Sequence, residues 1–171
     1  VMLSSETAMG DHPVEAVEAM SIICEGSEGQ NPLTMKGSNY SIENKKVDRA
    51  IAMACMLTAD NLNPKAIAAI TESGSTALWM SRINHSVPIF ALTTHTRTLR
   101  KVTLYRGVYP ARIKTIDTNH ETVNRDAVNV LTNLNVAKDD DLVIITKGDL
   151  AGIEGGTNAI KVVKVGHLIE V

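Results

Sequence analysis

Six consecutive residues of the 171-residue chain, Thr71 to Thr76 (TESGST), place four hydroxyl groups and one glycine between an apolar run and a helical pattern. Gly74 allows a tight turn, and the first amides of a helix lack intrahelical acceptors. Together with hydroxyl donors, these features are typical of phosphate-binding loops. Serine and threonine before a helix are more often simple N-caps, and the local pattern leaves that alternative open. The predicted phosphate-binding residues are Thr71, Ser73, Gly74, Ser75 and Thr76.

A sheet must position this loop. Apolar runs predict strands at 66–70, 87–92, 107–113, 142–146 and 158–165, and helical patterns lie at 42–62, 75–83, 96–105 and 119–134. Strands that alternate with helices indicate an α/β fold. We expect a three-layer αβα domain, with a five-stranded, mostly parallel sheet between two layers of helices. The last strand follows a glycine-rich loop and no helix, so we expect it to be antiparallel at an edge. The TESGST loop follows the carboxyl end of a parallel strand, where open α/β sheets bind ligands.

Composition limits the other possibilities. The chain is 44% hydrophobic and 21% charged but only 3% aromatic, which indicates a globular protein with an aliphatic core. A net charge of -2 without a basic run argues against nucleic-acid binding, and no apolar run is long enough to span a membrane. Cys24 and Cys55 lie in apolar helical contexts, which favours buried, reduced thiols in the cytoplasm; a disulfide remains the alternative. The histidines lack the spacing of metal ligands, so no metal site is expected.

The first residues have a different character. Residues 1–3 form an apolar run such as a buried parallel strand would use, and the polar residues 4–7 stand where that strand would end. A helical pattern follows to about residue 25. Polar side chains at the carboxyl end of a barrel strand are typically catalytic, although a plain strand end is the simpler interpretation.

The segment from Val1 to Pro13 (VMLSSETAMGDHP) resembles the last barrel strand and following helix of pyruvate kinase. The family pattern there is hydrophobic-Met-Leu-Ser-Gly-Glu-Thr-Ala followed by Gly, an aromatic residue and Pro. Ser5 replaces the usual glycine, and His12 replaces the aromatic residue. The family's Thr-x-Ser/Thr-Gly-x-Ser/Thr-Ala effector loop matches residues 71–77. Further matches are Arg82, PIFA at 88–91, LYRGVYP at 104–110, GD at 148–149 and GGTN at 155–158.

The resemblance implies the last strand and helix of a truncated (β/α)8 barrel at 1–27, a linker at 28–41 and a regulatory domain at 42–171. In the family, the residues that match Ser4 and Glu6 line the pyruvate side of the active site and take part in proton delivery. A hydroxyl and a carboxylate two positions apart on an extended chain point to the same side, which suits such a relay.

The parent enzyme would transfer phosphate from phosphoenolpyruvate to ADP in glycolysis, with Mg2+ and K+. The family's phosphate-binding arginine, its lysine and its metal-binding carboxylates all precede the part that matches Val1. We therefore expect this chain to be an inactive C-terminal fragment that holds no cofactor itself. By the same resemblance it is cytoplasmic and forms a homo-oligomer, a tetramer in the parent.

The regulatory domain of the family grips an effector phosphate, and a second loop, Lys147 to Asn158, would close over it. We include Lys147, Gly155 and Gly156 in the predicted effector site, although Lys147 could equally be a solvated residue at a strand end. Asp149 and Glu154 would repel a second phosphate. The expected partner is therefore a sugar monophosphate or AMP, as in the bacterial class that answers to these effectors.

Two alternatives belong to other functional classes. The same domain could be a stand-alone module that binds a phosphorylated ligand, but such a module does not need the LSSETA segment. An unrelated doubly wound enzyme is disfavoured, because no predicted strand is followed by Gly-x-Gly-x-x-Gly, a Walker loop or Gly-x-Ser-x-Gly.

Overall fold

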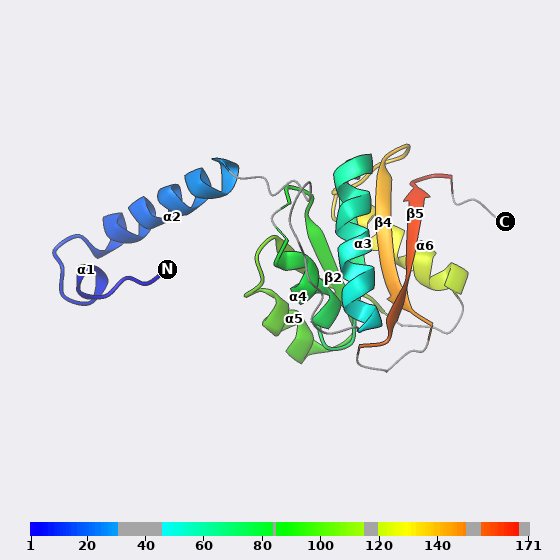
Figure 1. Cartoon of the computed structure of the whole chain (residues 1–171), viewed down its shortest axis with the longest axis horizontal. Coiled ribbons are helices and arrows are strands. Elements are labelled where there is room, and N and C mark those ends of the chain that lie inside the picture. Colours follow the sequence, from blue (N-terminus) through cyan, green and yellow to red (C-terminus); the bar gives the residue numbers. More distant parts are fainter. Residues whose placement is uncertain (31–45, 84, 115–119, 150–154, 168–171) are drawn as a thin grey trace. The chain divides into compact units, whose positions relative to one another are not determined.

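The computed structural model describes residues 1–30, 46–83, 85–114, 120–149 and 155–167. The chain divides into two compact units, Val1–Leu33 and Thr34–Val171. The first unit is helical and the second is an α/β unit (Figure 1). Within the described ranges, no helix is both long and apolar enough to cross a membrane.

The second unit is built on a five-stranded sheet with the order β3-β2-β1-β4-β5. Figure 1 shows β5 beside β4. Neighbouring strands among β1 to β4 are parallel, and β5 pairs antiparallel with β4 at one edge. Both the mostly parallel sheet and the antiparallel edge strand are thus confirmed. The strands are β1 (Ala66–Ile70), β2 (Ile89–Thr93), β3 (Val108–Arg112), β4 (Leu142–Gly148) and β5 (Thr157–Lys164).

Helices cover both faces of this sheet, which confirms the αβα layers. The helices are α3 (Val47–Leu62), α4 (Ser75–Ser81), α5 (Thr96–Val102) and α6 (His120–Asn133). Side chains alternate along β1: Ala66, Ala68 and Ile70 pack in the cluster that contains the α6 residues. Ile67 and Ala69 pack on the other face, in the cluster that contains residues of α3, α4 and α5. The first residues of the expected helix at 42–62 lie outside the described residues, and α3 begins at Val47.

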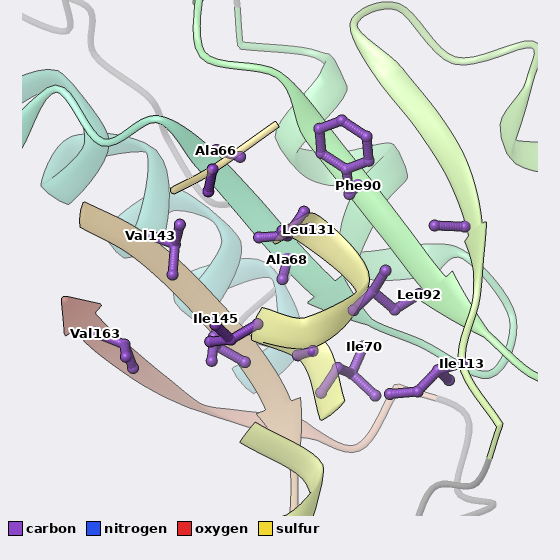
Figure 2. Close-up of a cluster of buried hydrophobic side chains, with 14 of the residues drawn as sticks. Ala66, Ala68, Ile70, Phe90, Leu92, Ile113, Leu131, Val143, Ile145 and Val163 are labelled. Atoms are coloured by element: carbon purple, nitrogen blue, oxygen red, sulfur yellow. The ribbon is translucent and has the colours of Figure 1, made fainter. Parts of the chain in front are cut away.

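The core is aliphatic, as the composition predicts. Figure 2 shows Leu131 of α6 over Ala68 of the central strand, with Val143 and Ile145 of β4 beside them. All five residues of β1 are buried. Such a strand, buried on both faces, explains why its sequence is a continuous apolar run rather than an alternating one.

The strand order creates a switch point beside β1. From β1 the chain moves outward through α4 and α5 to β2 and β3, and α6 then brings it back to β4 on the other side of β1. Open α/β sheets bind ligands outside the carboxyl ends of the strands at such a point. Here the segments that leave β1 and β4 are the two loops singled out by the sequence.

The first unit contains α1 (Ser5–Ala8) and α2 (Pro13–Gln30), and the expected strand over residues 1–3 is wrong. Val1 and Met2 are exposed. A strand needs neighbours to satisfy its backbone N–H and C=O groups, and the described part of this unit contains no other strand. The polar residues that follow form the short helix α1 instead.

The expected linker at 28–41 lies outside the described residues except for its first three positions, which belong to α2. Both cysteines are free thiols in the structure. Cys55 is fully buried in α3, and burial raises its pKa to about 12. Cys24 is only partly buried.

Candidate phosphate-binding site

The TESGST loop leaves β1 through a turn that requires glycine. Gly74 has a φ of 81° and is the N-cap of α4. A Cβ on Gly74 would lie 2.8 Å from Cγ1 of Val102, a fully buried residue of α5. Both the left-handed backbone and the close approach of α5 therefore exclude a side chain at this position.

No hydroxyl of the loop caps α4, so the simple N-cap interpretation is wrong. Thr71 Oγ1 instead accepts a hydrogen bond from the Gly74 amide at 2.9 Å and closes the turn. Ser75 Oγ donates to Asp48 Oδ2 at 3.3 Å. Thr76, only 1% exposed, shares a 2.6 Å hydrogen bond with the Thr157 hydroxyl. Three of the four predicted hydroxyl ligands thus already have partners within the protein.

Ser73 is the exception among the four. It is partly exposed, and its hydroxyl makes no hydrogen bond to any described residue. Its carbonyl accepts a hydrogen bond from Lys101 Nζ at 3.2 Å. Lys101 belongs to α5, whose Thr98 hydroxyl also donates to the Glu72 carbonyl at 2.6 Å. Helix α5 therefore holds the loop in shape and brings a cation to it.

The second loop, Lys147 to Asn158, is hydrogen-bonded to the first loop near its C-terminal end. The Thr76–Thr157 hydrogen bond joins the start of α4 to the start of β5. A Cβ on Gly148 would lie 2.5 Å from the Gly156 carbonyl oxygen, so the two ends of this loop approach closely at their backbones. Gly156 thus lies against Gly148, and a Cβ on Gly155 would lie 3.8 Å from Asp48 Oδ2. Asn158 donates to Asp149 at 2.7 Å, whereas Glu154 lies outside the described residues.

The side chain of Lys147 lies on the opposite face of the sheet from α4, the helix that the TESGST loop begins. Val143 and Ile145 belong to the cluster under α6, and side chains alternate along a strand, so Lys147 lies on the α6 face of the sheet. The TESGST loop leads to α4 on the opposite face. Lys147 is 8% exposed, which makes the solvated alternative wrong. Burial lowers its pKa, and Lys161 lowers that pKa further.

Asp48 contacts the predicted loop but is not among the residues that the sequence predicted for the site. It lies in the first turn of α3 and is 6% exposed. Its Oδ2 accepts the hydrogen bond from Ser75 and lies 3.8 Å from the position of a Cβ on Gly155. Asp48 and Lys101 reach the loop from helices 27 and 28 positions away in sequence. An acidic residue in a first helical turn was the only local signal.

Further charged contacts flank the loop. Glu72 Oε2 pairs with His95 Nε2 just before α5. On α4, Trp79 has the guanidinium of Arg49 3.8 Å from its ring centroid and that of Arg82 4.3 Å from it. Among the described residues, no group of three or more His, Cys, Asp or Glu could hold a metal ion.

The catalytic pair predicted at the beginning of the chain has a different geometry. Ser4 precedes α1 and Glu6 lies within it, so the expected extended backbone is wrong here. Glu6 Oε2 accepts a hydrogen bond from the Ser4 amide at 2.9 Å. Hydrogen bonds from the amides of Glu6 and Ser4 lower the pKa of Glu6, whose carboxylate is fully exposed.

Comparison with known proteins covers both units. Residues 49–163 match the family of the pyruvate kinase alpha/beta domain. The chain is 39% identical over 166 residues to the pyruvate kinase of Buchnera aphidicola from Schizaphis graminum and to pyruvate kinase II of Salmonella typhimurium. It is 33% identical over 165 residues to the pyruvate kinase of Thermotoga maritima. Each match includes 96% of this chain but only 34% of the relative, so the chain spans about a third of their length.

Proposed function

The chain belongs to the pyruvate kinase family, and from that premise we propose that its α/β unit binds a phosphorylated allosteric effector at the TESGST loop. The observation that carries the proposal is the position of the two loops. They leave β1 and β4 on either side of the switch point and are joined by the Thr76–Thr157 hydrogen bond. A ligand on the first loop would therefore be in reach of the second.

Three kinds of group are available for a phosphate. The backbone turns at Gly74, and no side chain caps the amides at the start of α4. The Ser73 hydroxyl makes no hydrogen bond to a described residue, and Lys101 supplies a cation beside the loop. Thr71, Ser75 and Thr76 contribute mainly by shaping the loop, because their hydroxyls are already bonded. Lys147 has no such role in this proposal.

The effector class that we propose is a sugar monophosphate or AMP. The support is the charge pattern: acidic Asp48 and Asp149 lie at or near the loops, where a second phosphate would be repelled. The proposed parent reaction is phosphate transfer from phosphoenolpyruvate to ADP, with Mg2+ and K+, in a tetrameric enzyme. The 171-residue chain alone should not catalyse it, and measurable turnover by the purified chain would contradict that part of the proposal.

A thermal-shift titration tests effector binding. Ribose 5-phosphate, glucose 6-phosphate, AMP and fructose 1,6-bisphosphate are compared at equal concentration. At least one monophosphate should raise the melting temperature of the α/β unit more than the bisphosphate does, because bound ligand stabilises the folded state. A larger shift with the bisphosphate would contradict the proposed class.

Two lysine variants locate the site. Lys101→Gln should weaken monophosphate binding about 3- to 10-fold, since it removes an exposed charge beside the phosphate. Lys138→Gln makes the same change before the amino end of β4, at the opposite end of the parallel strands from the loop, and should leave binding unchanged. Equal losses in the two variants would show only a general charge effect.

A further inference from the structure

Asp48 is a buried carboxylate at the point where the two loops approach each other. Its Oδ2 is 3.3 Å from Ser75 Oγ in the first loop and 3.8 Å from the Cβ position of Gly155 in the second. Its Oδ1 accepts a hydrogen bond from the Arg49 amide at 2.9 Å. Among the described residues, no lysine, arginine or histidine forms an ion pair with Asp48.

A carboxylate in this position affects a ligand by its charge. Asp48 is 6% exposed, so water screens it far less than a surface carboxylate. Neither of its two partners, a serine hydroxyl and a backbone amide, neutralises the charge. Repulsion of a second negative group between the loops is therefore strong, whereas a hydroxyl group of a ligand would find an acceptor there.

Resting on the proposed effector site, we infer that Asp48 is its specificity-determining residue and restricts it to ligands that carry one phosphoryl group. The first loop binds that phosphoryl group. Any second phosphoryl group directed at the second loop approaches the Asp48 carboxylate, which lies between the loops. The remainder of a bound ligand donates a hydroxyl to Asp48 Oδ2 instead.

A purely structural role for Asp48 makes a different prediction. An acidic side chain in a first helical turn stabilises the helix, and the bond to Ser75 holds the loop. If Asp48 did only this, its replacement would weaken monophosphate and bisphosphate binding together. The ratio of the two affinities is therefore the readout that separates specificity from structure.

The test is isothermal titration calorimetry of the 171-residue chain with glucose 6-phosphate and with glucose 1,6-bisphosphate, which differ by one phosphoryl group. The wild-type chain should prefer the monophosphate by at least about tenfold. Asp48→Asn keeps the shape and the acceptor for Ser75 but removes the charge, and it should reduce the preference to within about threefold. Asp60→Asn removes the same charge near the other end of α3 and should retain the wild-type preference.

The outcomes distinguish the two proposals. If wild type binds neither ligand, the proposed effector site fails, and the role of Asp48 fails with it. If wild type binds the monophosphate but Asp48→Asn keeps the tenfold preference, only the inference about Asp48 is overturned. The inference can also be tested if Asp48→Asn does not fold. Equal or tighter binding of the bisphosphate by the wild-type chain would by itself overturn it.

Discussion

Two short apolar runs in this chain look alike in sequence, and only one of them is a strand. Residues 1–3 (VML) precede the polar segment SSETA, and residues 66–70 (AIAAI) precede TESGSTA. The second run is β1, paired on both sides and fully buried, whereas the first begins a helical unit with Val1 and Met2 exposed. The difference teaches that neighbouring strands, rather than the run itself, decide whether an apolar segment becomes a strand.

The same contrast extends to the two units as a whole. Every fully buried apolar side chain of the described structure lies in the α/β unit, from Ala52 to Val165. In α2, Val14, Val17 and Ile23 remain exposed. Trp79, the one tryptophan of the chain, lies in α4, so its fluorescence reports on the unfolding of the α/β unit.

Removing equal apolar volume from each unit should give the largest difference. Ile144→Ala in the buried centre of β4 should lower the free energy of unfolding by about 3 kcal/mol, from lost burial and the cavity left behind. Ile23→Ala, at an exposed position of α2, should leave that free energy unchanged within about 0.5 kcal/mol. Urea unfolding followed by Trp79 fluorescence measures both. Similar losses would show that α2 supports the α/β unit.

Replacing glycines by alanine tests how tightly the TESGST loop is packed compared with other parts of the chain. Gly74→Ala should cost about 2–3 kcal/mol, because its φ is positive and the new Cβ would meet Val102. Gly107→Ala, with positive φ but open space around it, should cost only about 1 kcal/mol. Gly26→Ala in α2, where nothing lies within 4 Å, should increase helicity slightly in far-UV circular dichroism. Equal costs at positions 74 and 107 would mean that α5 does not clamp the loop.

The bond between the two loops can be broken from either side. Thr76→Val or Thr157→Val should each cost about 1–2 kcal/mol, because each leaves one buried hydroxyl without its partner. The double variant should cost less than the sum of the two, since no orphan hydroxyl remains. Thr7→Val, which removes an exposed hydroxyl in the first unit, is the matched control and should change nothing measurable. Additive losses in the cycle would contradict the coupling of the loops.

The smallest expected effect is a difference in how salt changes the pKa values of two exposed carboxylates, Glu6 in the first unit and Asp140 in the second. Backbone hydrogen bonds lower the pKa of Glu6, whereas Lys164, 2.6 Å away, lowers the pKa of Asp140 with a smaller contribution from His167. A lowered pKa favours the ionised form in the folded state, so its stabilisation is present above the unfolded pKa and is lost as pH falls through the folded value.

Nuclear magnetic resonance titration at two salt concentrations separates the two causes. Salt should move the pKa of Asp140 toward its usual value more than that of Glu6, because screening weakens charge–charge attraction. Lys164→Met should raise the pKa of Asp140 and leave Glu6 unaffected. The same salt response at both carboxylates would contradict the assigned causes.

The sequence predicted the α/β unit well because its signals are local and agree with one another. Five apolar runs, the helices between them and the glycine-rich loop before β5 each point to the observed element and order. The strand at residues 1–3 was wrong because its expected neighbours are absent from the described first unit, a condition that no local pattern reveals.

The site was only partly predictable. The TESGST loop was predicted from its local pattern and the resemblance, and Gly155 from the resemblance, but the residues that contact them come from distant segments. Asp48 and Lys101 reach the loop through helix packing, and Lys147 is turned to the α6 face by strand alternation. Local sequence does not report which side chains meet when residues 27 or 28 positions apart are brought together by packing on the same sheet.

The central claim is that the α/β unit binds a phosphorylated effector at the first loop while the helical unit does not. Amide chemical shifts of the labelled chain, recorded during titration with glucose 6-phosphate, test it most directly. We expect saturable shift changes at residues 72–76 and 155–157 and none along α2. No saturable change at residues 72–76, or a larger one in α2, would contradict it.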